Sequence, residues 1–449
     1  MRRIVLLALA LAALETTPAA AAPLTADDAV KIALQHSTQM IQANASVLDA
    51  RGGMWSAYSG ILPRVSGSIG RNGSFTKLSS GSQAFGGFVT QPSSTYDAEA
   101  FSGSTEVSGS WSILDLSSWT SWSSARQGAR AANFDRSAAR ADVILATKRQ
   151  FYEVVKSMHL ARVSSQALRL ARDDERRVNA LFEVGSVSKS DLLKARVRTS
   201  QSELDSLVAN HTVTVQRINL ATQIGIPEAE LAEVDSTLNP AAGTVDAANV
   251  LAEARASRPD LKAAEASLKA AELSLRSARF SRLPYVTMGG SWTPNSKRSS
   301  KFYSDAAHDS GSTFSSSETE DAVSGNIAVN LNIFDGLATE GRVSSARASV
   351  LRARATRDAL FRNLDSEVRQ VLLLYQEAIE REALGRRTVE SAGENLNLVQ
   401  QKYNVGSATI LDLIDSQVQY QRAQSDLVSA LAAIRVAEAS LDRVRGVSQ

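Results

Sequence analysis

Three aspartates have the type and spacing to act together: Asp191, Asp412 and Asp415. Asp412 and Asp415 are three residues apart, so on a helix they share one face and form a local concentration of negative charge. Asp412 follows Thr409 by three positions, and Asp191 follows Ser188 in the same way, which is typical of the cap of a new helix. Capping does not explain Asp415, which lies one turn further on.

No residue pattern predicts catalysis. The histidines have no metal-ligand spacing, and the chain carries neither a phosphate-binding Walker loop nor a serine elbow. It has no cysteine, which removes disulfides, thiol catalysis and cysteine metal sites. We therefore expect no enzyme activity, no cofactor and no metal site. The net charge of +2, with acids and bases interspersed, also argues against a nucleic-acid partner. The histidines are His36, His159, His211 and His308.

The aspartates follow two related turns. A long helical pattern breaks at Val-Gly-Ser in each half of the chain, and a second helix begins within a few residues. Glycine provides the backbone freedom that the end of a helix needs. Each half therefore contains a helical hairpin, and we expect function at its tip. The tip residues are Val184, Gly185 and Ser186 in the first half, and Val405, Gly406 and Ser407 in the second.

The hairpins belong to an internal repeat. Leu62-Pro63 matches Leu283-Pro284, and Ser123-Ser-Ala-Arg126 matches Ser344-Ser-Ala-Arg347, both at an offset of 221 residues. A register that holds over so long a stretch indicates a duplicated chain. We predict a signal peptide, a first repeat, an equatorial linker and a second repeat at 1–21, 22–226, 227–245 and 246–449.

Each half has the same predicted order of elements, based on periodicity and on the position of proline. The first half contains a helix, two strands separated by a loop, a long helix and a return helix, at about 25–61, 65–76, 101–114, 118–181 and 188–224. The second half repeats this order at about 246–282, 285–294, 322–334, 338–402 and 409–444. Serine-rich and glycine-rich loops are expected at about 77–100 and 296–320. The proline-free helices are far longer than globular helices, so we predict a coiled-coil rod.

The first residues resemble a secretory signal. Arg2 and Arg3 precede an apolar run, and Ala19 and Ala21 fit an A-x-A cleavage site. The alternative is a short membrane anchor, but the run is shorter than the ~18 apolar residues that a span needs. No later segment has the length and hydrophobicity of a membrane helix.

The predicted strands are long enough to cross a bilayer at a tilt, which takes ~9–11 residues. Strands in lipid must close into a barrel, and four strands cannot do so. A membrane sheet would therefore require several copies of the chain. The alternative is a soluble four-stranded sheet that caps a helical bundle. The predicted export and the duplicated order of elements favour the membrane.

These motifs together resemble the outer-membrane factor family, the TolC-like outer membrane efflux proteins. The resemblance rests on Leu-Pro before each strand pair, the strand ends Ile113-Leu-Asp115 and Ile333-Phe-Asp335, and the Phe/Tyr-x-Val-Gly tips followed by Asp-Leu. It covers both halves of the mature chain. It implies a homotrimer with a twelve-stranded β-barrel in the outer membrane lipid of a Gram-negative bacterium and a long α-helical tunnel in the periplasm. It also implies an exit duct of a tripartite efflux pump or type I secretion system, joined through a periplasmic adaptor to an inner-membrane transporter.

The resemblance also assigns roles at the tips. Asp412 and Asp415 match the acidic residues that ring the periplasmic mouth, while Tyr403 and Asp191 match members of the network that closes it. The tip turns match the contact with the adaptor; as plain helix-ending turns they would need no partner. In the best-known family member a tip arginine helps to lock the mouth, and here that position is Ala408. We hypothesise that Lys194, the repeat counterpart of Asp415, replaces it by reaching an acidic residue on a neighbouring return helix. A solvated lysine is the alternative.

The sequence therefore predicts a mainly α-helical chain with a small β part, which acts as a passive outer-membrane duct. The alternative from a different class is an exported trimeric coiled-coil fibre. Duplicated strand pairs argue against it, because a fibre has no use for them. The cargo stays open between a drug, a metal ion and a secreted protein.

Overall fold

The computed structural model describes residues 23–80, 83–85, 88–91, 94–238, 247–304 and 313–446. The predicted signal peptide lies outside them. The chain divides into two compact units. The sheet unit comprises Asp49–Arg130 and Glu265–Ala355. The helical unit comprises Met1–Leu48, Ala131–Ala264 and Thr356–Gln449, so far as these ranges are described.

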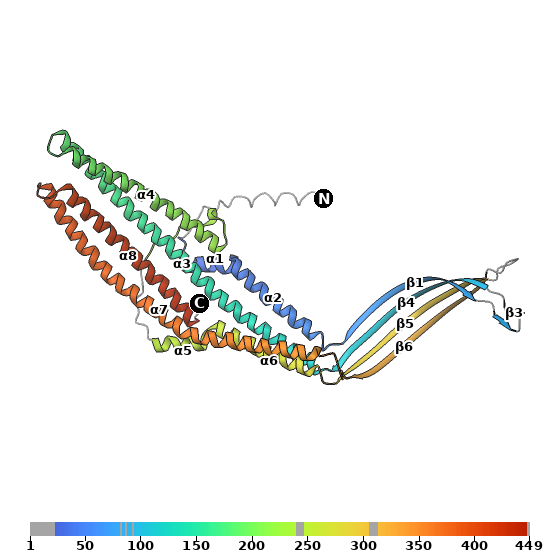
Figure 1. Ribbon diagram of the computed structural model, residues 1–449. Helices are drawn as coiled ribbons and strands as arrows, with labels where there is room; N and C mark the ends of the chain where they lie inside the picture. Colours follow the sequence, from blue (N-terminus) through green and yellow to red (C-terminus); the bar gives the residue numbers. More distant parts are fainter. Residues whose placement is uncertain are drawn as a thin grey trace, which may run out of the picture. The chain divides into compact units, whose positions relative to one another are not determined.

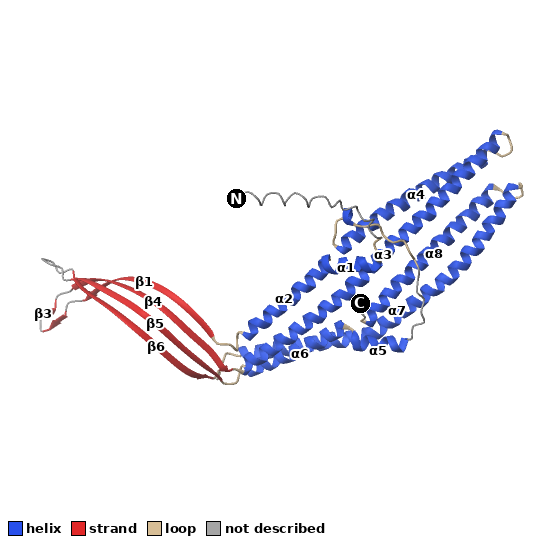
Figure 2. Cartoon of the chain, turned by 180° about the vertical axis from the view of Figure 1, so that it is seen from behind, coloured by secondary structure: helices blue, strands red, loops and turns tan. Residues whose placement is uncertain are grey.

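Four long antiparallel strands form the sheet unit's main sheet, in the order β1-β4-β5-β6 (Figures 1 and 2). The strands are β1 (Arg64–Ser80), β4 (Ser94–Leu114), β5 (Tyr285–Ser304) and β6 (Thr313–Asn330). A short hairpin, β2 (Gln83–Phe85) and β3 (Phe88–Gln91), lies between β1 and β4 in the chain. Within the described residues, β1 and β6 each pair with one neighbour only, so the sheet has two open edges.

The two faces of this sheet differ in polarity. Register pairs place apolar residues of all four strands on one face, because cross-strand partners share a face. On the edge strands these residues are exposed, with Ile69 at 84% and Val323 at 81%. The opposite face is rich in serine, and Ser66 bonds Ser108 at 2.9 Å. The apolar face includes Val65, Ile69, Val107, Trp111, Met288, Trp292, Val323, Ile327 and Val329.

The strands are longer than the sequence patterns predicted. The predicted loops at about 77–100 and 296–320 are wrong over much of their length, because strand pairing continues through most of both segments. Serine-rich and charged residues there gave no apolar alternation, yet backbone pairing with a neighbouring strand extends the ladder. In the other direction, β6 ends at Asn330, earlier than predicted.

The predicted strand ends at Asp115 and Asp335 are helix caps. The Asp115 carboxylate accepts from the backbone N–H of Ser117 and Ser118, at 2.9 and 3.2 Å. Asp335 accepts from the backbone N–H of Thr339 at 2.9 Å. Both aspartates therefore satisfy amides in the first turns of long helices that follow the sheet. The repeated Asp thus marks the change from strand to helix in both halves.

Helices dominate the rest of the chain. The long helices are α3 (Leu116–Glu183) and α7 (Ala338–Asn404), and the return helices are α4 (Lys189–Ile224) and α8 (Ile410–Arg445). The others are α1 (Ala26–His36), α2 (Thr38–Tyr58), α5 (Ala247–Ser257), α6 (Pro259–Phe280) and the short 3-10 helix η1 (Glu228–Glu230). Within the helical unit, α3 lies beside α4 and α7 beside α8 (Figure 1). None of the described helices is long and apolar enough to cross a membrane.

Two predicted helices are in fact pairs. The helix expected at 25–61 breaks at Ser37, which has extended backbone (ψ 136°) and accepts from the Met40 N–H through its hydroxyl. The helix expected at 246–282 breaks at Arg258, because the following Pro259 disfavours a helical residue before it. The predictions of single helices were wrong because the patterns on both sides share one period.

The return helices end against these two breaks. Gly225, which caps α4 at φ 80°, lies so close to α1 that a Cβ there would be 2.5 Å from the His36 carbonyl oxygen. Gly446 caps α8 at φ 73°, and a Cβ would be 3.0 Å from the Arg258 nitrogen. In each half the C-terminal end of the return helix thus meets a shorter helix pair at the break between its two helices.

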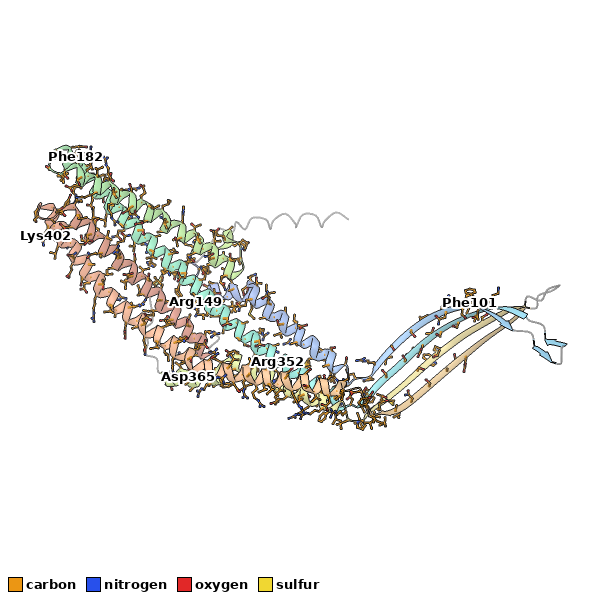
Figure 3. The ribbon with its side chains drawn as sticks, in the orientation of Figure 1. Phe101, Arg149, Phe182, Arg352, Asp365 and Lys402 are labelled. Carbon is orange, nitrogen blue, oxygen red and sulfur yellow. The ribbon has the colours of Figure 1, made fainter. Side chains whose placement is uncertain are left out.

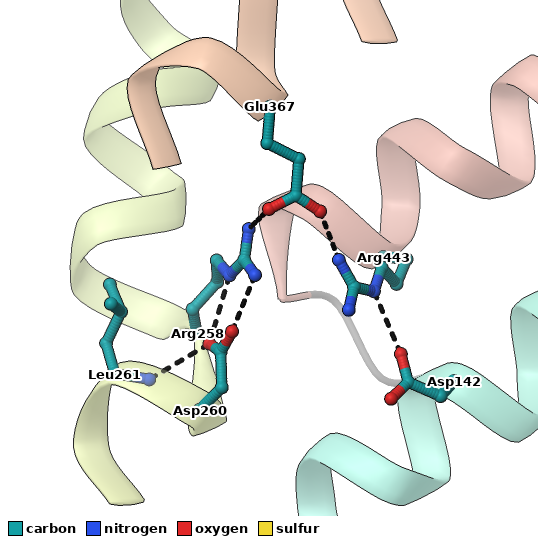
Figure 4. Close-up of polar contacts among 6 residues, drawn as sticks. All are labelled: Asp142, Arg258, Asp260, Leu261, Glu367 and Arg443. Carbon is teal, nitrogen blue, oxygen red and sulfur yellow. Dashed lines mark hydrogen bonds and ion pairs between the residues drawn. The ribbon is translucent and has the colours of Figure 1, made fainter. Parts of the chain in front are cut away.

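Both ends pack among buried apolar side chains, and the end of α8 has ion pairs in addition. Apolar side chains, among them Leu220 and Ile224 with no exposed surface, pack around the end of α4. Beside the end of α8 lies a charged network (Figure 4). Glu367 of α7 bonds Arg258 at 2.5 Å and also pairs with Arg443 of α8. Arg258 further bonds Asp260, and Arg443 bonds Asp142 of α3 at 3.0 Å.

Candidate functional site at the hairpin tips

The two tip turns have the same backbone. Gly185 and Gly406 adopt φ values of 74° and 76°, which non-glycine residues rarely adopt. The Ser186 N–H donates to the Leu181 carbonyl, and the Ser407 N–H to the Lys402 carbonyl, each at 2.8 Å. These bonds satisfy carbonyls at the helix end. Figure 3 labels Phe182 and Lys402, which lie in the last turns of α3 and α7.

The predicted caps form at both return helices. The Ser188 hydroxyl accepts from the Asp191 N–H, and the Thr409 hydroxyl accepts from the Asp412 N–H, each at 3.2 Å. At α8 the Asp412 carboxylate also accepts from the Thr409 N–H at 2.8 Å, which completes a capping box. Both turns are thus held by local bonds without a partner chain.

The two tips differ in charge. Lys194 lies one turn beyond Asp191 on α4, and its Nζ is 3.1 Å from the Asp191 carboxylate. Bonds from Ser188 and from Lys194 lower the pKa of Asp191. The bond from the Thr409 hydroxyl likewise lowers the pKa of Asp412. Both aspartates are therefore charged at neutral pH, but only Asp191 has a lysine beside it.

Asp412 and Asp415 lie on one exposed face of α8, as predicted. The Asp415 carboxylate accepts from the Gln419 amide at 2.6 Å, one turn further on. Gln419 thus extends the same polar stripe along the helix. Two carboxylates and an amide on one open face can attract and coordinate cations loosely, or repel a like surface on another copy.

Tyr403 sits behind the tip. It packs against a small apolar cluster that includes Val178, Leu192, Ile410 and Leu413. Burial raises the pKa of its phenol, so Tyr403 is neutral over the whole physiological range. The tyrosine therefore joins α7 to α3, α4 and α8 directly behind the turns.

Two polar contacts below this cluster were not predicted. The buried Gln417 of α8 donates through Nε2 to the buried Asp174 of α3 at 2.6 Å. Arg177 of α3 donates to Asn404 of α7 at 3.2 Å. The sequence does contain a signal for the first contact, since Asp174 interrupts the otherwise apolar helical stripe of Ala171 and Val178.

An open groove of about 760 Å³ separates α4 from α8 near the tips. Its α8 wall is apolar, with Leu411, Ile414 and Val418. The α4 wall is mixed, with Leu193 and Val197 beside Lys194 and Arg198. Lys194, the predicted replacement for the tip arginine, thus lies at the edge of a groove whose opposite wall is the other return helix, α8. In the part of the chain that the structure describes, no group of three or more acidic or histidine side chains is arranged to hold a metal ion.

Comparison with known proteins identifies this architecture. The family model of the outer membrane efflux proteins matches residues 29–226 and again 250–447. The outer membrane protein TolC of Vibrio cholerae is 23% identical over 331 residues, which are 73% of each chain. Nodulation protein T of Rhizobium leguminosarum bv. trifolii is 24% identical over 355 residues, 75% of this chain and 69% of its own.

The fold is that of solved outer-membrane channels. The CmeC outer membrane channel of Campylobacter jejuni superposes with a TM-score of 0.76 at 16% identity, over 94% of this chain and 85% of its own. The predicted fold class, mainly helical and duplicated with a small sheet, is confirmed. The boundaries of the predicted repeats stay predictions. Two family matches in one chain, a tip turn in each, and this fold together place the chain in the outer membrane efflux protein family, a family of channels in the outer membrane of Gram-negative bacteria.

Proposed function

We propose that this protein is the exit duct of a tripartite efflux pump or type I secretion system and conducts its cargo passively. The observation that carries the proposal is the sheet, with one exposed apolar face and two open edges. Val65 and Ile69 on β1, and Val323 on β6, would each face water in a soluble chain, at 76%, 84% and 81% exposure. Lipid explains the face, and neighbouring copies explain the edges. Three copies would give twelve strands, enough to close a barrel.

The tips are the proposed docking point for a periplasmic adaptor, which would link the duct to an inner-membrane transporter. Val184 and Val405 project from the turns with 74% and 78% of their surface exposed. Local bonds already satisfy both turns, so these valines are not needed to hold them. Exposed apolar side chains at the same place in both repeats suit contact with the apolar stripe of a partner helix. The proposed contact residues are Val184, Gly185, Ser186, Val405, Gly406 and Ser407.

The α8 tip is the proposed constriction. In three copies Asp412 and Asp415 would bring six carboxylates together, which attracts cations and opposes closure. We propose that Tyr403 and Asp191 support this mouth. Lys194 would offset part of the repulsion in place of the arginine absent at Ala408, by reaching an acidic residue of a neighbouring return helix from the rim of the groove.

Single-channel conductance in a planar bilayer tests both parts of this proposal, with divalent cations titrated in. We expect a small, cation-selective conductance that divalent cations block. The double change Asp412→Asn and Asp415→Asn should remove the block, because asparagine can keep the cap while losing the charge. Asp205→Asn is the matched control, because Asp205 is a partly exposed aspartate of α4 that accepts a hydrogen bond from Gln201.

Each other outcome has a definite meaning. Conductance that ignores the double change would keep the duct and reject this constriction. Protein that never inserts, and that stays soluble without detergent, would reject the duct in favour of an exported fibre.

A further inference from the structure

The contact between Asp174 and Gln417 is unusual for a helical interface. Both side chains are buried, each with 7% of the residue exposed, next to an apolar cluster that includes Val178 and Leu413. The Gln417 amide donates to the Asp174 carboxylate at 2.6 Å. A buried carboxylate is costly unless it is bonded, so this contact fixes how α8 sits against α3.

Gln417 is also close to the proposed constriction. It follows Asp415 by two positions and Asp412 by five, on the opposite, buried side of α8. Any rotation or outward movement of α8 that carries the two aspartates must therefore stretch or break the bond to Asp174. A second hydrogen bond, from Arg177 to Asn404, joins the same stretch of α3 to α7.

We propose that Asp174 and Gln417 form a proton-sensitive latch that positions α8, and with it the acidic face of Asp412 and Asp415. This role rests on the proposed function of the duct. Asp174 is a positioning residue, since it lies on the buried side of the helix pair and acts on the mouth through α8. The latched state is the conformation described here, and release exposes Asp174 to water.

The charges around Asp174 set the direction of the proton effect. On α3, Asp173 acts to raise its pKa, and Arg177, whose Nη1 is 4.0 Å away, acts to lower it. On α8 the Gln417 amide also lowers it, and from α7 the neutral Tyr403 is the nearby titratable group. Burial outweighs the lowering contacts, so the pKa of Asp174 is above its ordinary value.

A proton therefore binds more tightly to the latched state than to a released state in which Asp174 is hydrated. By linkage, acidification favours the latch, and the latch weakens as pH rises through the raised value. Asparagine at this position keeps an acceptor for Gln417 and imitates the protonated carboxyl. Gln417→Leu removes the amide donor, so the buried Asp174 carboxylate loses this hydrogen bond.

The absence of cysteine makes a clean test available in the full-length protein purified in detergent. Ser416→Cys places one thiol on the buried side of α8, where Ser416 is 2% exposed. The rate of its labelling by a maleimide at pH 7.5 reports how often α8 leaves its neighbours. Gln417→Leu should speed labelling by about tenfold or more, the factor that corresponds to loss of one buried hydrogen bond. Asp174→Asn should leave the rate unchanged or slow it.

Asp173→Asn is the control, because Asp173 is an exposed neighbour on the same helix, paired with Arg176. It should change the rate less than twofold. Equal rates in Gln417→Leu and the parent would overturn the latch, as would an effect of Asp173→Asn as large as that of Gln417→Leu. Labelling is read without any conductance measurement, so the latch and the duct can fail separately.

The proton effect has its own readout. The labelling rate relative to that of Ser200→Cys, an exposed position on α4, should fall on acidification in the parent. In Asp174→Asn this ratio should no longer depend on pH. A ratio with the same pH dependence in both proteins would reject Asp174 as the proton-sensitive group.

Discussion

The two return helices, α4 and α8, have the same length and the same ends, yet they differ in charge and in anchoring. Each has 36 residues, a hydroxyl cap at its start and a left-handed glycine at its end. At the tip, Lys194 on α4 stands where α8 has Asp415. At the other end, both helices pack among apolar side chains, but only α8 also joins a network of ion pairs. The residues that determine the backbone are thus shared by the repeats, while the residues that carry charge have diverged.

Substitution of the glycines that cap both return helices should have the largest effect on stability. Gly225→Ala adds a Cβ that would lie 2.5 Å from the His36 carbonyl oxygen, in a backbone conformation that costs alanine about 1–3 kcal/mol by itself. We expect the unfolding free energy to fall by about 3 kcal/mol or more, because the backbone atoms of His36 cannot move aside. The measurement is the midpoint of thermal unfolding, followed by circular dichroism. Gly446→Ala should cost less, since its nearest contact is 3.0 Å.

Gly185→Ala separates the two causes. Gly185 has a similar φ of 74°, but no atom lies within 4 Å of the added Cβ. Gly185→Ala should therefore lower the unfolding free energy only by the cost of holding alanine at a positive φ. Equal losses for Gly185→Ala and Gly225→Ala would show that the approach to His36 is unimportant.

The ion pairs at the end of α8 give the second test. Glu367→Gln removes the charge that joins Arg258 to Arg443, and we expect it to cost about 1.5–3 kcal/mol in unfolding free energy, as for a charge-assisted hydrogen bond. Asp365→Asn is the control, because its pair with Arg369 is exposed and should contribute less than about 1 kcal/mol. If both changes cost the same, the network does not anchor α8.

Lys194→Ala should have the smallest effect on stability. The pair with Asp191 is exposed and within one helix, which contributes about 0.3–0.5 kcal/mol. The informative readout is conductance, which should rise if Lys194 offsets the acidic mouth of the trimer. Conductance identical to that of the parent would make Lys194 a solvated lysine with no part in the constriction.

Much of this fold could be predicted from the sequence. The long helices were placed within about two residues, because proline-free periodic stretches between glycine turns leave little choice. The caps at Ser188 and Thr409 were also predicted, since a hydroxyl followed by an acid three residues later acts through local bonds. The strand extensions and the breaks at Ser37 and Arg258 were missed. Pro259 was a local signal for the second break, but the strand extensions depend on pairing with other strands.

The sequence by itself determined the order of the elements, their duplication and the conformation of both tip turns, because each depends on residues a few positions apart. Only the tertiary structure decided which long-range partners meet. It brought Gln417 to Asp174, Glu367 to Arg443, and the apolar residues of four strands to one face. These contacts join residues tens to hundreds of positions apart, and no local pattern specifies the packing that selects them.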